Sequence, residues 1–102
     1  LCVAPGFIDL HSHADDAARP GGLRSASTAK RAAPNLVAQG ITTAVVNQDG
    51  RSLLDIGLQR QALEEGGLGL HAALLIGHNT VRRHVMGADH KRAANADELE
   101  AM

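Results

Sequence analysis

Apolar residues gather in three short runs along the chain, and each run ends in polar residues or glycine. Short runs that are rich in β-branched residues and bounded by glycine or proline are typical of buried strands. The pattern predicts strands over residues 7–13, 41–47 and 70–77. The third run could also be a buried helix by composition, but its place after a Gly-Gly-Leu-Gly segment favours a strand.

Residues 27–39, between the first two runs, are rich in alanine and predict a helix that closes at Gly40. Pro34 lies inside this segment and removes a backbone donor, so it must kink the helix or begin a second short one.

A second helix is predicted between the second and third runs. Ser52 and Asp55 have the spacing of a capping box, in which a hydroxyl caps the helix and an acid follows three residues later. Leu54, Leu58 and Ala62 recur every four residues, and we expect them to share the buried face.

The order of strand, helix, strand, helix and strand predicts a parallel sheet with helical crossovers, and the fold class is therefore α/β. Residues 14–24 form a long loop directly after the first strand, a place where loops often carry function. Residues 77–87 predict a loop with one helical turn, and Asn95 with Glu98 resembles a further helix cap.

Composition narrows the classes of function. Ten basic residues oppose eleven acidic ones and aromatic residues make up 1% of the chain, which argues against a nucleic-acid partner. No apolar run is long enough to cross a bilayer, so we expect no membrane partner. The sequence also shows no leader pattern, and we slightly favour a cytoplasmic location over export of the protein to which this chain belongs. The single Cys2 allows no internal disulfide.

His11 and His13 are the strongest candidates for chemistry. They lie two residues apart at the carboxyl end of the first predicted strand, so the pleat sends both imidazoles to the same side. Two neutral imidazoles on one side can bind a zinc-type ion. The alternative is that they are ordinary polar residues at a strand end, but active sites of parallel α/β sheets lie at this end.

Asp49 follows the second predicted strand and is expected at the same end of the sheet, where its carboxylate could complete a metal site. An ordinary Asp-Gly turn is the alternative. Asp15 and His78 are candidates for the second shell of the site or for substrate contacts. His71 begins the third strand at the opposite end, and His84 and His90 lie among basic residues of an expected surface.

The segment Val-Ala-Pro-Gly-Phe-Ile-Asp-Leu-His-Ser-His, residues 3–13, resembles the opening signature of the amidohydrolase superfamily. Residues 37–50 and 77–87 are similar to segments of its N-acyl-D-amino-acid deacylase (D-aminoacylase) branch. The first signature is shared with dihydroorotases and hydantoinases, and the three segments together are more specific to the deacylases.

The resemblance implies a metal-dependent hydrolase built on a (β/α)8 TIM-type barrel, of which residues 1–102 would be the first three βα steps. It implies that His11 and His13 bind one or two zinc ions, or another divalent metal. Asp49 stands where some members have a cysteine ligand. The further ligands and the catalytic aspartate would lie beyond residue 102.

The implied reaction is deacylation of a small-molecule N-acyl-D-amino acid by the longer parent protein, and we expect the 102-residue chain alone to be inactive. Two alternatives remain at this stage. One is a relative of the cyclic amidases, of hydantoinase or dihydroorotase type, and the other is a non-catalytic α/β binding module in which the histidines are structural.

Overall fold

A computed structural model of the chain describes residues 1–16 and 21–102 and shows a three-stranded parallel sheet in the order β1-β2-β3. The strands are β1 (Phe7–Asp9), β2 (Ile41–Val46) and β3 (His71–Leu74). The predicted α/β class and parallel sheet are therefore confirmed, although each strand is shorter than the predicted ranges of 7–13, 41–47 and 70–77. The arrangement is consistent with the start of a βα barrel, since each crossover between parallel strands is helical.

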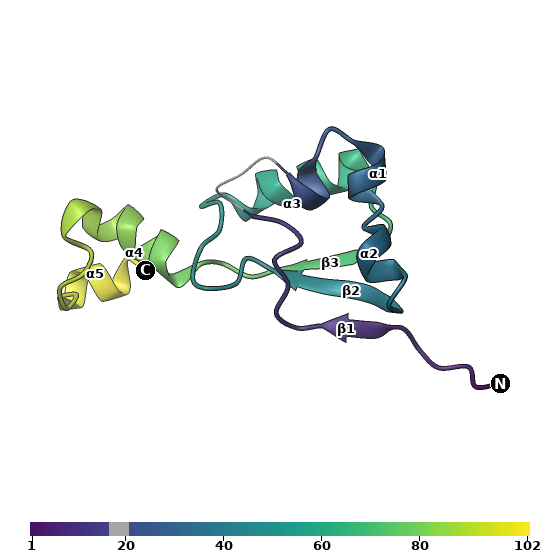
Figure 1. Cartoon of the computed structure of the whole chain (residues 1–102). Helices are drawn as coiled ribbons and strands as arrows, with labels where there is room; N and C mark the ends of the chain where they lie inside the picture. The colour runs from purple at the N-terminus through teal and green to yellow at the C-terminus, as the bar shows by residue number, and fades with distance from the viewer. Residues whose placement is uncertain (17–20) are drawn as a thin grey trace.

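Helices and short 3-10 turns fill the crossovers and the C-terminal part of the described chain (Figure 1). They are η1 (Gly22–Arg24), α1 (Thr28–Arg31), α2 (Pro34–Val37), α3 (Ile56–Gly66), α4 (His78–Met86), η2 (Gly87–Asp89) and α5 (Ala96–Glu100). α1, α2 and α3 lie on one side of the sheet, while α4 and α5 extend beyond its carboxyl end (Figure 1). Part of the predicted functional loop over 14–24, residues 17–20, lies outside the described residues.

The core lies between the sheet and the helices on that one side. Ala44 and Val46 of β2 are fully buried against Leu23 and Leu63, and Leu70 closes the cluster before β3. Alternate residues of each strand point to the opposite face, and no helix among the described residues covers that face (Figure 1). The molecule is thus built from one helical layer and one sheet layer.

Pro34 divides the first predicted helix, as one of the two sequence alternatives requires. α1 ends at Arg31, Ala33 adopts a left-handed conformation with φ of 46°, and Pro34 is the first residue of α2. Proline is well suited to this position because its missing N–H would have no partner inside the helix.

The predicted cap and buried face of α3 are wrong. Asp55 is the N-cap and accepts a hydrogen bond from the Leu58 amide at 3.1 Å. Ser52 instead accepts a hydrogen bond from the Gly77 amide at 2.9 Å, which joins the loop after β2 to the end of β3. Leu54, Leu58 and Ala62 are exposed, because α3 turns the row of Gln59 and Leu63 toward the sheet.

The segment expected to be a loop over 77–87 is a helix for most of its length, α4. The amino end of α4 is capped by the loop after β2, because Gly50 O accepts hydrogen bonds from the amides of Asn79 and Thr80. The predicted cap at Asn95 is confirmed: Asn95 and Glu98 form a complete capping box at α5.

The molecule is elongated, with extents of 57 × 30 × 18 Å. Its radius of gyration is 16.2 Å, whereas a compact domain of this length has about 13 Å. Within the part of the chain that the structure describes, no helix has the length and apolar character needed to span a membrane.

Candidate metal centre

The candidate centre lies where β1 and β2 end. Beyond β1 the chain stays beside β2, because the Ser12 amide donates to Val45 O at 3.0 Å. The side-chain amide of Gln48 donates to both Leu10 O and Val45 O at 3.0 Å. These bonds tie the His-Ser-His segment to the loop after β2.

His11, His13 and Asp49 come together at this place, with one ligand atom from each lying within 4.8 Å of the other two. Nε2 of His11 is 3.6 Å from Oδ1 of Asp49, and Nε2 of His13 is 3.3 Å from Oδ2. The two imidazole rings have centroids 5.3 Å apart. Ser12 between them is buried, and its hydroxyl oxygen accepts a hydrogen bond from the Ala14 amide at 3.3 Å.

Both imidazoles lie close enough to the Asp49 carboxylate to share a metal ion with it, each facing a different carboxylate oxygen. Ligand bonds of about 2.0–2.1 Å place neighbouring ligand atoms roughly 3.3 Å apart, close to the two separations from Asp49 to the histidines. The side chains of His11, Asp49 and His13 are 62%, 62% and 66% exposed. The group is therefore open to solvent, as a site with a free coordination position requires.

A tight backbone turn presents Asp49. Asn47, Asp49 and Gly50 have φ of 71°, 60° and 74°, all in the left-handed region. Asparagine and aspartate tolerate this region better than other residues with side chains. The Asp-Gly turn, which was the alternative to a metal ligand at this position, is present. The turn also places the Asp49 carboxylate next to the two histidines.

A buried polar network lies beneath the same loops. Gln59 of α3 is 0% exposed. Its side-chain nitrogen donates to Asp15 Oδ2 at 2.8 Å and to Asn47 Oδ1 at 2.9 Å, and its oxygen accepts from Asn47 Nδ2 at 2.9 Å. Arg24 donates to the same Asp15 oxygen at 2.6 Å. Asp15 is thus buried under the candidate centre, two residues after His13.

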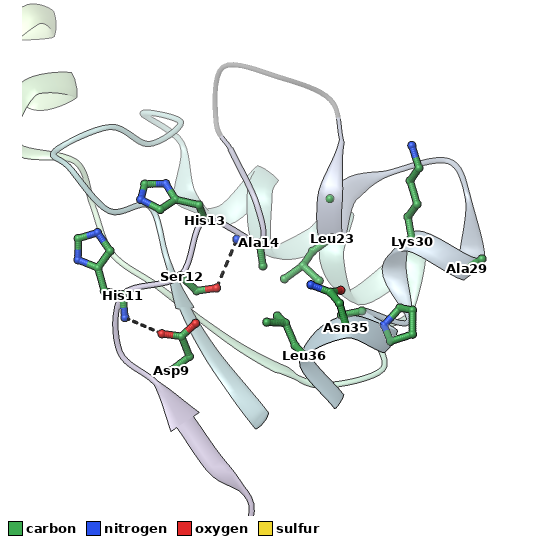
Figure 2. A pocket seen from close by; sticks show the side chains of 13 residues that line it. Asp9, His11, Ser12, His13, Ala14, Leu23, Ala29, Lys30, Asn35 and Leu36 are labelled. Carbon is green, nitrogen blue, oxygen red and sulfur yellow. Dashed lines mark hydrogen bonds between the residues drawn. The ribbon is translucent and has the colours of Figure 1, made fainter. Parts of the chain in front are cut away.

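Two hollows border the centre. A groove of about 590 Å³ lies beside the end of β1, with Leu23 and Leu36 among its lining residues. Figure 2 shows the rings of His11 and His13 turned away from these two leucines. A polar cleft of about 390 Å³ lies on the other side. It is lined by His13, Asp15, Asp16, Asn47, Gln48, Asp49, Arg51 and Asn79.

His78, the other expected substrate or outer-shell residue, is exposed at the first position of α4. Among the described residues that line the polar cleft, its neighbour Asn79 takes part and His78 does not. Gln59 and Asn47 were absent from the sequence candidates. Gln59 lies on a different face of α3 from the one that the sequence predicts to be buried. Only the orientation of α3 against the sheet reveals that Gln59 is buried.

Comparison with known proteins finds sequence similarity to an enzyme. The chain is similar to a D-aminoacylase. That protein, from Alcaligenes xylosoxydans xylosoxydans, is 33% identical over 125 residues, and the match covers 100% of this chain and 24% of the relative. No family model matches the chain, and no solved structure gives a significant match.

Proposed function

We propose that this chain carries the first metal ligands of an amidohydrolase that removes the acyl group from N-acyl-D-amino acids, and that turnover belongs to a longer parent protein. The convergence of His11, His13 and Asp49 at the carboxyl edge of the sheet carries the proposal. The similarity to the D-aminoacylase supports it, and the chain spans about a quarter of that enzyme's length.

Zinc fits the donor set of two imidazole nitrogens and one carboxylate, the mixture that catalytic zinc sites use. His11 and His13 would hold the ion through Nε2, and Asp49 through its carboxylate. When bound, zinc lowers the pKa of a water molecule toward about 7 and polarises a carbonyl group. The open side of the three ligands leaves room for an amide to approach.

The rest of the chain orients these ligands. Gln48 and the Ser12 amide keep the ends of β1 and β2 at a fixed separation, and the turn at Asn47 and Asp49 aims the carboxylate. A proton donor for the leaving amine is the remaining requirement for amide hydrolysis. We propose that the parent protein supplies it from outside these 102 residues.

A zinc titration tests the site. We expect the chain to bind one zinc ion and His11→Ala, His13→Ala or Asp49→Ala each to weaken binding by more than the roughly 10–100-fold that outer-shell partners typically cost. Isothermal titration calorimetry measures the affinity. His71→Ala is the matched control, because His71 is exposed at the opposite end of the sheet. Equal affinity for the His11 and His71 variants would exclude the site.

An activity assay tests the reaction. We expect the full parent protein to release the amino acid from N-acetyl-D-amino acids but not from their L-isomers, to lose this activity in His11→Ala, and the 102-residue chain to show none. Hydrolysis of hydantoin or dihydroorotate instead would assign the cyclic amidase alternative. Zinc-independent folding with no hydrolysis of any of these amides would favour the binding module.

A further inference from the structure

The buried network below the candidate centre links the two loops that carry its ligands. Asp15 follows His13 by two residues, and Asn47 precedes Asp49 by two. Gln59 hydrogen-bonds both Asp15 and Asn47 through one buried amide. Asn47 is tied further to β3, because its side chain donates to Leu75 O at 2.8 Å.

The side-chain amide of Gln59 is an unusual group to find on the buried face of α3. Leu63, one turn further along the helix, packs into the apolar core, whereas Gln59 is completely buried and polar. Burial of an amide is unfavourable unless its hydrogen bonds are made, and apolar residues of similar shape can replace such a group without loss only where its polar partners are replaced as well. The amide at position 59 therefore calls for an explanation other than core packing.

The contacts of Gln59 supply that explanation. Its amide nitrogen and oxygen form two reciprocal hydrogen bonds with Asn47, a residue in the left-handed region at φ of 71°. That backbone conformation determines where Asp49 lies. The third bond, to Asp15, holds the chain that leaves His13. One side chain thus contacts both of the loops that carry the candidate ligands.

We propose that Gln59 is a positioning residue for the candidate metal centre, acting through Asn47 on Asp49 and through Asp15 on His13. The inference rests on the metal site of the proposed function. Gln59 does not touch the ion in this scheme. It reduces the freedom of the two ligand loops, so that less ordering is needed when a metal binds.

The test replaces Gln59 by methionine, which has similar length and no amide. In Gln59→Met we expect the zinc dissociation constant to rise about 10–100-fold. Without metal, amide hydrogen exchange of residues 47–50 should become faster relative to β2. Leu63→Ala is the matched control: it lowers stability from the same face of α3 and should leave both the affinity of the folded chain and the relative exchange unchanged.

A double-mutant cycle with Asp49→Ala separates positioning from general stability. If Gln59 acts through Asp49, then adding Gln59→Met to Asp49→Ala costs much less affinity than it costs the wild-type chain. Should Gln59→Met not fold, Asn47→Gly replaces it. Glycine accepts the φ of 71° at this position and deletes the same pair of bonds, together with the bond from Asn47 to Leu75 O.

The outcomes separate the two proposals. Zinc binding by the wild-type chain that is insensitive to Gln59→Met and Asn47→Gly would overturn the positioning role and leave the proposed function intact. Fully additive losses in the cycle would also overturn it. A wild-type chain that binds no zinc would overturn both.

Discussion

Gly77 shows how a single residue controls the approach of two loops. It is the buried N-cap residue of α4, beyond the end of β3, and its amide donates to Ser52 in the loop after β2. A Cβ atom at this position would lie 2.5 Å from Gly50 O and 2.6 Å from the carbonyl carbon of Arg51. Both are backbone atoms, so they cannot give way as the end of a flexible side chain would. Only glycine fits here without moving the loop that carries Asp49.

We therefore expect Gly77→Ala to lower the free energy of unfolding by about 1–3 kcal/mol, the usual cost of overpacking, and to weaken zinc binding. Gly21→Ala is the control, because Gly21 has extended backbone and no atoms within 4 Å of an added Cβ. It should change stability by less than about 0.5 kcal/mol. Urea denaturation measures both variants, and equal midpoints would refute the packing argument.

At the residue scale, sequence reasoning could place what depends on strand geometry alone. Parallel strands end at the same edge of the sheet, which brings Asp49 beside His11 and His13. The predicted strand over 7–13 ends at Asp9, however, so the two histidines follow β1 and the two-residue period of a strand does not place them. Sequence reasoning could not place Gln59 or Ser52, whose partners Asp15 and Gly77 lie 44 and 25 positions away. Such contacts arise from the packing of α3 and β3, which no local pattern contains.

Among the helices, α5 depends on an electrostatic cap that responds to pH. Hydrogen bonds from Arg92 and from the Asn95 amide lower the pKa of Glu98 to about 2, from an ordinary value of 4.5. Since the folded-state pKa is the lower one, the stabilisation is present above pH 4.5 and is lost as the pH falls through about 2.

We expect the amide NMR signals of Ala96–Glu100 to keep their helical shifts down to about pH 4.5 and to lose them progressively toward pH 2. The Glu98→Gln substitution should remove most of this pH dependence, because the side chain of glutamine does not ionise. A wild-type profile that matches Glu98→Gln would show that the Arg92 pair does not stabilise the helix.

The sequence pattern predicts a helix or its cap correctly where the residues that control it are close together in the sequence. The prediction is wrong where the controlling contact comes from another part of the chain. Pro34 ends a helix because of its own ring, and the Asn95 cap needs only residues of its own turn. α4 was missed because Asn79 and Thr80 are weak helix formers and its amino end is capped by Gly50 from another loop. The buried side of α3 was misassigned because a four-residue repeat of Leu54, Leu58 and Ala62 does not identify which face meets the sheet.

On the scale of the whole molecule, both outer strands of the sheet have an unpaired edge within the described chain, and one face of the sheet is open. Ile8 of β1 is 61% exposed and pairs with Thr43 of β2. Unpaired edges beside exposed apolar residues favour pairing with another chain.

We expect the 102-residue chain to self-associate as its concentration rises, and Ile8→Lys to weaken the association roughly tenfold by placing a charge at the edge. Leu99→Lys is a matched control, since Leu99 of α5 is also 61% exposed but lies away from the sheet. Sedimentation velocity measures the association. Equal effects of the two variants would show that general charge, rather than the strand edge, is responsible.

The thinness of the molecule, 18 Å along its shortest axis, bears on how the chain melts. One helical layer on one sheet layer buries less apolar surface per residue than a domain with covered sheet faces does. The heat capacity of unfolding scales with the apolar surface exposed, and compact domains show about 1.2–1.5 kcal/mol/K per 100 residues. The isolated chain should fall below that range, with a broad thermal transition and a flat stability curve.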